Sequence, residues 1–164
     1  RPEFDLFVNV QGDEPEIDPA AIDRLVELLA ANPAAPMATL AAPMRNPERI
    51  VDPANVKVVF DNAGRALYFS RAPIPFVRDA GEASPDAEPT HHHHIGLYAY
   101  RRDFLLALPD LPPSPLEGAE RLEQLRVLQA GHSIQVGVIP TATAGIDTPE
   151  DYAGFVRRQA RRAA

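Results

Sequence analysis

The sequence predicts an α/β protein built on a mixed, partly parallel sheet. Short apolar runs typical of buried strands occur at residues 6–10, 95–100 and 134–139. Segments with the apolar spacing of amphipathic helices separate these runs along the chain. Residues 56–60 and 66–69 flank turn residues and indicate an inserted hairpin.

The first half of the chain resolves into elements as follows. Residues 6–10 are apolar nearly throughout, as central parallel strands are. Asp18 is a good N-cap residue, and Pro19 suits the first helical turn. One face of that helix carries Ile22, Leu25, Val26 and Leu29. A further short strand is expected at residues 37–40, ahead of the hairpin, whose turn is residues 61–64.

The second half begins with a segment of turn-forming composition. Residues 78–90 are rich in Pro, Gly and acidic side chains and predict a mobile loop. Residues 114–117 read Ser-Pro-Leu-Glu, a capping box that predicts a helix running to about residue 131. Thr148 and Pro149 mark the start of a C-terminal helix after the last strand.

Composition excludes several classes of function. The net charge of −7 argues against nonspecific binding to nucleic acid or to an anionic membrane. The absence of cysteine excludes disulfides and thiolate metal sites. No apolar run approaches the ~20 residues that a membrane-spanning helix needs. We therefore expect a cytoplasmic protein, without a nucleic-acid or membrane partner.

Two aspartates follow predicted strands and are candidate ligands of a hard cation. Asp13 lies in Gln-Gly-Asp-Glu-Pro directly after the first strand, and Asp147 lies in Gly-Ile-Asp-Thr-Pro after the last. Ligands of open α/β sheets bind beyond the carboxyl ends of strands, and Mg²⁺ prefers oxygen ligands. Both residues also fit plain turn or capping roles, and spacing alone does not bring them together.

A polar pair, Glu123 and Gln124, lies within the helix that is predicted to begin near residue 115. Leu122, Leu125 and Leu128 form one apolar stripe at helical spacing. The polar pair points away from this stripe, toward either solvent or a partly enclosed site.

Arg71 and the histidines are the remaining candidates. Arg71 ends a strand, where it is either an ordinary surface residue or a bidentate ligand of a carboxylate. The run at residues 91–94 invites a metal interpretation, but the first three histidines adjoin the predicted loop and need no ordered role. His94, at the edge of a strand, is the plausible site residue.

In this order the motifs resemble CMP-Kdo synthetases (3-deoxy-manno-octulosonate cytidylyltransferases). The matching segments are Val-Asn-Val-Gln-Gly-Asp-Glu-Pro (residues 8–15), Val-Lys-Val-Val (56–59), Ala-Leu-Tyr-Phe-Ser-Arg-Ala-Pro-Ile-Pro (66–75), His-Ile-Gly-Leu-Tyr-Ala-Tyr (94–100), Pro-Ser-Pro-Leu-Glu (113–117), Leu-Glu-Gln-Leu-Arg-Val-Leu (122–128) and Gly-Ile-Asp-Thr-Pro-Glu-Asp (145–151). The resemblance covers nearly the whole chain. It implies a Rossmann-like nucleotidyltransferase (GT-A-like) fold, a mixed sheet with helices on both faces, here truncated at its N-terminus.

The resemblance also implies a reaction and roles for residues. The anomeric hydroxyl of Kdo, an acidic sugar, would attack the α-phosphorus of CTP to give CMP-Kdo for lipopolysaccharide, with release of pyrophosphate. Asp13 and Asp147 would be the catalytic carboxylates that hold Mg²⁺. The residues that would line the sugar-binding site are Gln11, Arg71, His94, Tyr98, Glu123 and Gln124. Arg71 is the candidate for the sugar carboxylate.

The resemblance further implies one partial nucleotidyltransferase domain over residues 1–164. Within it, residues 54–105 would form a sugar-binding and dimerisation insertion of a homodimer.

One departure from the family's pattern is large. Members begin with a strand and a basic loop of the type Pro-Ala-Arg-x-x-Ser-x-Arg-x-Pro-Gly-Lys-Pro-Leu, which grips the triphosphate, and residues 1–164 contain no such loop. We therefore expect the chain to begin within a fold and to be inactive alone. A cytidylyltransferase for another acidic sugar, such as a sialic acid, and a non-catalytic remnant that binds sugar or a partner are the alternatives.

Overall fold

The computed structural model describes residues 3–12, 15–78, 89–141 and 149–162. Strands and helices are mixed along the described chain, which confirms the predicted α/β class. The elements are β1 (Leu6–Val10), α1 (Pro19–Ala31), β2 (Met37–Met44), α2 (Pro47–Val51), β3 (Lys57–Phe60), β4 (Ala66–Ser70), β5 (His91–Arg101), α3 (Arg102–Ala107), the 3-10 turn η1 (Leu108–Asp110), α4 (Pro115–Glu120), α5 (Gln124–Gln129), β6 (Ile134–Val138) and α6 (Pro149–Arg162).

The sheet has six strands and is organised around β5. Its order is β4-β3-β5-β2-β6, and β1 pairs with the C-terminal half of β5. β2 and β6 run parallel, while the other pairings are antiparallel. The partly parallel sheet is thus confirmed. The expectation that β1 is a central parallel strand is wrong. β1 pairs antiparallel with β5, and its last two residues are exposed. An apolar run alone does not determine the direction of a strand.

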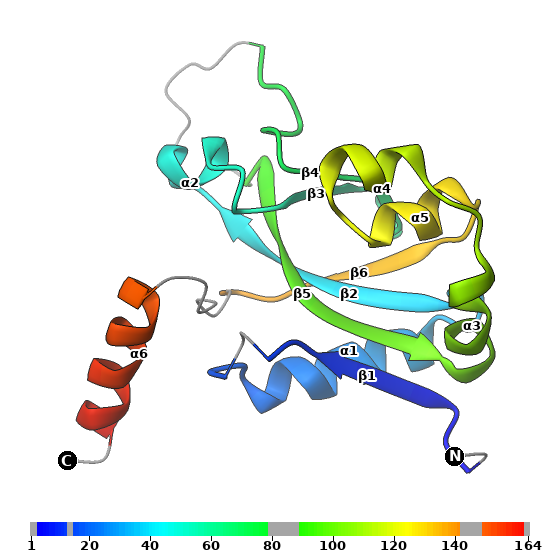
Figure 1. Ribbon diagram of the computed structural model, residues 1–164, viewed down its shortest axis with the longest axis horizontal. Coiled ribbons are helices and arrows are strands. Elements are labelled where there is room, and N and C mark those ends of the chain that lie inside the picture. Colours follow the sequence, from blue (N-terminus) through cyan, green and yellow to red (C-terminus); the bar gives the residue numbers. More distant parts are fainter. Residues whose placement is uncertain (1–2, 13–14, 79–88, 142–148, 163–164) are drawn as a thin grey trace.

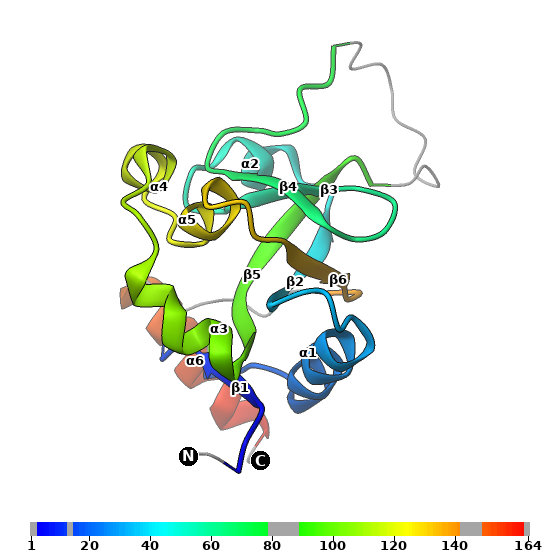
Figure 2. The same ribbon diagram turned by 90° about the vertical axis from the view of Figure 1, so that its right-hand side faces the viewer.

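Helices cover both faces of the sheet (Figures 1 and 2). Asp18 caps α1 by accepting a hydrogen bond from the amide of Ala20, and this helix packs on one face. Buried residues of that layer are Leu25, Leu28, Leu29, Ala38, Leu40, Ile95, Leu97 and Ala99. Helices α3, α4 and α5 lie over the other face, whose core contains Met37, Val58, Phe69, Tyr98, Tyr100, Phe104, Leu122, Leu125, Val127, Ile134 and Val136.

A bulge interrupts the pairing of β2 with β5. Thr39 faces Tyr98, but the next residue of β2, Leu40, faces Ile95. Gly96 and Leu97 therefore have no counterpart on β2, and the local ladder is broken. This irregularity lies on the strand that carries two of the candidate site residues.

The predicted single helix after residue 115 is wrong, because the chain forms two short helices. Arg121 adopts a left-handed conformation with φ 55° and ends α4. The carbonyl oxygen of Glu120 instead accepts a hydrogen bond from Nε of Arg71, at 2.8 Å. Side chains from another element thus satisfy the helix end, which no local pattern reveals.

The expectation that residues 91–93 need no ordered role is also wrong. They begin β5 and pair with the last residues of β2. The ring of His92 lies 4.9 Å from that of Phe60, and Nε2 of His91 lies 3.1 Å from the carbonyl oxygen of Pro75. Cross-strand pairing, which acts between distant segments, extends the strand beyond its apolar core.

Several predictions lie outside the described residues. These are the positions of Asp13, Asp147 and Thr148 and most of the predicted loop, residues 79–88. Within the described ranges, no helix is both long and apolar enough to cross a membrane. The C-terminal helix α6 begins where the sequence predicts, and its Arg158 and Gln159 bind the carboxylate of Glu16.

Candidate functional site

A pocket of about 480 Å³ lies on the sheet face covered by α3, α4 and α5. One side is apolar and the other carries charged and amide side chains. The lining residues are Phe7, Val8, Asn9, Met37, Tyr100, Leu105, Leu108, Glu117, Glu123, Gln124, Arg126 and Val127. Polar groups converging in a largely apolar pocket are typical of a small-molecule site.

Gln124 is the most informative residue of this pocket. The break at Arg121 starts α5 at Gln124 and turns its side chain inward, so that it is only 2% exposed. Among the described residues its Nε2 finds no hydrogen-bond partner. Buried amide donors are nearly always paired, so an unpaired one in a pocket indicates a group that a ligand would satisfy. Glu123, beside it, is exposed and lines the same pocket.

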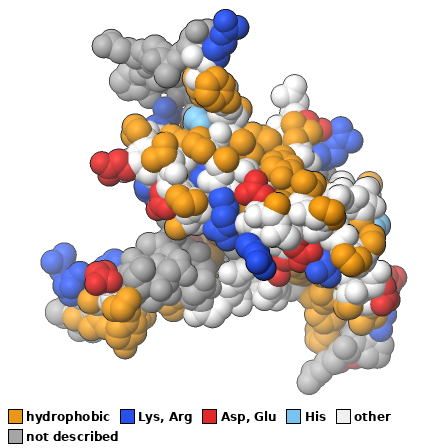
Figure 3. Space-filling model, turned by 45° about the horizontal axis from the view of Figure 1, so that its top comes forward, with side chains coloured by type: hydrophobic (Ala, Val, Ile, Leu, Met, Phe, Trp, Pro, Cys, Tyr) orange, Lys and Arg blue, Asp and Glu red, His pale blue; other side chains and the backbone are white. Residues whose placement is uncertain are grey.

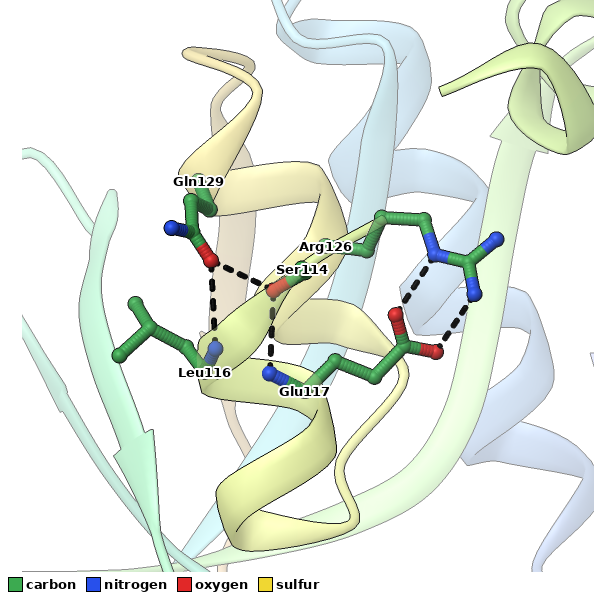
Figure 4. Close-up of polar contacts among 5 residues, drawn as sticks. All are labelled: Ser114, Leu116, Glu117, Arg126 and Gln129. Atoms are coloured by element: carbon green, nitrogen blue, oxygen red, sulfur yellow. Dashed lines mark hydrogen bonds and ion pairs between the residues drawn. The ribbon is translucent and has the colours of Figure 1, made fainter. Parts of the chain in front are cut away.

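An ion pair fixes α5 against α4 (Figure 4). Arg126 binds both carboxylate oxygens of Glu117, with nitrogen–oxygen distances of 2.6 and 2.9 Å. The hydroxyl of Ser114 accepts from the amide of Glu117 and donates to Oε1 of Gln129. The predicted cap at Ser114 is confirmed, whereas the Glu117 side chain serves Arg126. These contacts hold α5, which begins at Gln124, against α4.

His94 and Tyr98 are four residues apart in β5 and lie on the same face of the sheet. Nε2 of His94 lies 2.9 Å from the hydroxyl of Thr39, and its ring contacts those of Phe69 and Tyr98. Burial, with a smaller effect of neighbouring His93, lowers the pKa of His94 to about 3. Burial raises the pKa of Tyr98 well above its usual value, and the charge of Glu123 adds to this effect. Both rings are therefore neutral at ordinary pH.

Gln11 reaches the same face from the end of β1. Its amide occupies the space that a Cβ on Gly96 would need, with Oε1 only 3.1 Å from that position. Because Gly96 has no side chain, Gln11 can lie against β5 at this position. Gly96 is two residues from both His94 and Tyr98 along the strand.

Arg71 is held differently from the other candidates. Its guanidinium donates to the carbonyl oxygens of Glu120 at 2.8 Å, Pro53 at 2.9 Å and Arg121 at 3.4 Å. Its own carbonyl oxygen accepts from Nζ of Lys57 at 2.6 Å. Lys57 is fully buried and also binds the carbonyls of Asp52 and Asn55. Arg71 therefore joins three segments in this structure.

The predicted site residues are thus brought together in part. Gln11, His94 and Tyr98 lie along one face of the sheet, and Glu123 and Gln124 lie in the pocket over that same face. Arg71 stands at the end of β4, engaged with the junction of α4 and α5.

No described residues form a metal centre by themselves. Within the described ranges, no three His, Asp or Glu side chains gather where a metal could bind. The candidate ligands Asp13 and Asp147 lie outside these ranges. Their carboxylates are donors of the kind that Mg²⁺ prefers, so the donor chemistry fits this ion.

Sequence reasoning missed the residues that support the site. Thr39 contacts His94, Lys57 contacts Arg71, and Arg126 secures the position of Gln124. A signal existed for two of them: Thr39 is a polar residue within an apolar strand, and Lys57 is the only lysine of the chain. Nothing in the local pattern says which partner either side chain meets.

The fold is a mixed sheet with helices on both faces and a pocket over one of them, and comparison with known proteins shows the family to which it belongs. The profile of the cytidylyltransferase family matches residues 2–134. The chain belongs to the cytidylyltransferase family.

Its relatives include 3-deoxy-manno-octulosonate cytidylyltransferases. That of Solibacter usitatus is 52% identical over 147 residues, which cover 90% of this chain and 56% of the relative. That of Syntrophotalea carbinolica is 50% identical over 154 residues, covering 92% and 62%. A solved structure of CMP:2-keto-3-deoxy-manno-octonic acid synthetase complexed with CTP superimposes with a TM-score of 0.88 at 39% identity, covering 98% of this chain and 64% of that one. The chain thus spans roughly three fifths of these proteins.

Proposed function

We propose that the protein of which this chain forms part transfers CMP from CTP to 3-deoxy-D-manno-octulosonate (Kdo). The anomeric hydroxyl of the sugar attacks the α-phosphorus of CTP, and CMP-Kdo and pyrophosphate are released. The product would serve the synthesis of lipopolysaccharide. The similarity to proteins named for this reaction supports the choice of substrates.

The observation that carries the proposal is the unpaired, buried amide of Gln124 in its pocket. A polyhydroxylated sugar supplies acceptors for Nε2 and donors for the carboxylate of Glu123 nearby. The apolar wall formed by residues such as Met37 and Val127 excludes water from one side. Arg126, the basic side chain of the lining, is already bound to Glu117. The pocket therefore matches a sugar better than a bare phosphate, which would call for free basic side chains.

The remaining sugar contacts are assigned to Gln11, His94 and Tyr98 on β5's face, and to Arg71. Gln11 and the neutral rings of His94 and Tyr98 are suited to hydroxyl groups. Arg71 would meet the sugar carboxylate only if the ligand displaced some of its carbonyl partners.

Mg²⁺ is proposed to bind Asp13 and Asp147. It would neutralise phosphate charge and orient the nucleophile and the leaving group. The described residues act on the other substrate: they bind the sugar, orient it and exclude water.

A homodimer is proposed through the outer strand of the hairpin, within residues 54–105. In the described sheet β4 pairs only with β3, and its Leu67 is 62% exposed. Phe76, shortly after β4, is 85% exposed. Hydrophobic side chains gather on the upper part of the molecule, where the hairpin and the α4–α5 pair lie (Figure 3). Exposed apolar side chains beside an open strand edge favour pairing with a second copy.

The test measures pyrophosphate release with CTP, Kdo and Mg²⁺. Residues 1–164 are compared with the same residues joined to the N-terminal part of the Solibacter usitatus relative. We expect transfer by the joined protein and at least ~10²-fold slower transfer by residues 1–164, because these contain no basic loop for the triphosphate.

The controls separate the alternatives. A sialic acid replaces Kdo in a parallel assay, and preference for it would assign a different acidic sugar. No transfer to either sugar by the joined protein would reject a cytidylyltransferase activity. Equal turnover by the two proteins would show that the basic loop is dispensable.

A further inference from the structure

The hydroxyl of Thr39 lies where β5 leaves its regular ladder with β2. The bulge follows Ile95 and leaves Gly96 and Leu97 without a counterpart on β2. Oγ1 of Thr39 instead approaches the carbonyl oxygens of Ile95 at 3.2 Å and Leu97 at 2.9 Å. Thr39 is fully buried, so no water competes for these contacts.

The same hydroxyl lies 2.9 Å from Nε2 of His94. A threonine hydroxyl has one hydrogen and two lone pairs, and a carbonyl oxygen can only accept. If the single hydrogen of Thr39 pointed to His94, both carbonyl oxygens would face a lone pair of the hydroxyl. The hydrogen therefore points to one of the two carbonyls, of which that of Leu97 is the nearer at 2.9 Å. The contact with His94 is then a hydrogen bond donated by Nε2. The proton of the imidazole accordingly resides on Nε2, and Nδ1 carries the lone pair.

The surroundings of the ring keep this arrangement fixed. The ring of Phe69 lies edge-on at 4.9 Å, and that of Tyr98 lies at 5.4 Å. Because burial lowers the pKa of His94 to about 3, the ring stays neutral at ordinary pH. Its tautomer, and not its charge, thus decides what it can bind.

We propose that Thr39 is a positioning residue that holds His94 as the Nε2–H tautomer, so that Nδ1 accepts a hydrogen bond from a hydroxyl group of the sugar. The inference rests on the proposed function, in which His94 contacts the sugar. An acceptor at Nδ1 attracts a hydroxyl and repels a carboxylate oxygen. His94 therefore recognises the hydroxylated part of the acidic sugar, and its carboxylate is bound elsewhere.

The tautomer is measured directly, without reference to activity. Long-range ¹H–¹⁵N correlation spectra of the joined protein, labelled at histidine, distinguish the two tautomers at pH 7. His94→Gln identifies the signals. We expect the Nε2–H form in the wild type and in Thr39→Ser, and a shift toward the Nδ1–H form in Thr39→Val. The Nδ1–H form in the wild type, or an unchanged tautomer in Thr39→Val, would overturn the inference.

Kinetics then test the consequence for the sugar. Thr39→Val, which keeps the shape of the side chain, should raise KM for Kdo about tenfold, the loss of one hydrogen bond, with KM for CTP unchanged. Thr39→Ser, which keeps the hydroxyl, should stay within about twofold of the wild type. Circular dichroism and thermal unfolding verify that each variant folds.

The two failures remain distinguishable. An altered tautomer with an unchanged KM for Kdo would overturn the inference and leave cytidylyl transfer intact. Absence of transfer by the joined protein with wild-type Thr39 would reject the proposed function, and the spectra would still decide the tautomer.

Discussion

Two buried glutamines differ in what they do for the fold. Gln124 is 2% exposed and its Nε2 has no partner among the described residues, whereas Gln135 is 7% exposed and donates to the carbonyl oxygen of Ala63 at 2.7 Å. Gln124 has a hydrogen-bond donor without a partner, whereas Gln135 attaches the hairpin turn at Ala63 to β6. Function and stability therefore separate at these two positions.

Replacing each glutamine by methionine tests this separation. Gln124→Met should leave the free energy of unfolding unchanged or raise it by about 1 kcal/mol, because an unpaired buried donor is removed. The same variant should weaken sugar binding by about tenfold or more. Gln135→Met should destabilise by roughly 1–3 kcal/mol, since the carbonyl of Ala63 loses its donor. Urea unfolding and Kdo titration measure these effects; a marked destabilisation by Gln124→Met would contradict the assignment.

A second prediction concerns Gly96 and Gln11. A Cβ at Gly96 would lie 3.1–3.3 Å from the amide atoms of Gln11. Gly96→Ala should therefore displace Gln11 while leaving β5 paired. We expect a higher KM for Kdo with a change in stability below about 1 kcal/mol. Gly118→Ala, where a Cβ meets nothing within 4 Å, is the control for sugar binding and should leave KM for Kdo unchanged. Because Gly118 lies inside α4, this variant should gain up to about 1 kcal/mol of stability.

Among the elements, the short helices α4 and α5 depend on one another. Neither is long enough to be stable alone, so contacts between them must define their arrangement. The Glu117–Arg126 pair and the Ser114–Gln129 hydrogen bond supply these contacts on the side shown in Figure 4. Because Gln124 begins α5, loss of this arrangement would move it relative to the sheet.

Arg126→Lys tests this clamp. Lysine keeps the charge but not the two parallel hydrogen bonds to Glu117. We expect a lower free energy of unfolding than that of the wild type and faster hydrogen exchange at the amides of α5. The matched control is Arg102→Lys, whose ion pair with Asp103 is exposed. Equal effects of the two substitutions would show that the hydrogen bonds of Arg126 to Glu117 do not stabilise the arrangement of α4 and α5.

For the whole molecule, the half-buried His93 and the buried His94 make stability depend on pH. Burial, with charges of Arg49 and Lys57, lowers the pKa of His93 to about 4, and burial lowers that of His94 to about 3. The unfolded chain binds these protons near pH 6.5. Since the folded pKa lies below the unfolded one, the contribution is present above pH 6.5 and is lost as the pH falls toward 4 and 3.

The expected outcome is a free energy of unfolding that decreases below pH 6.5. Each histidine should contribute a slope of up to roughly 1.4 kcal/mol per pH unit. His93→Gln should remove about half of this slope. Urea unfolding between pH 7 and 5 measures the slope. A slope unchanged by His93→Gln would show that its burial does not govern the pH dependence.

The sequence by itself determined the α/β class, most of the strands and the caps of α1 and α4. These features follow from local periodicity and from residues such as Asp18 and Ser114, whose side chains bond to amides two or three residues away. It also singled out Gln124 and His94, since their motifs resemble those of one family. Both kinds of feature depend on residues that are near one another in the sequence, so they can be inferred from the sequence alone.

Only the tertiary structure decided how these residues are held. The helix break at Arg121 depends on Arg71, the extension of β5 to His91 depends on β2, and the tautomer of His94 depends on Thr39. Each partner is fifty or so positions distant in sequence or lies on another strand, so no local pattern encodes the contact. Packing of the sheet and its helices brings such pairs together, and it is this packing that leaves Gln124 buried and unpaired.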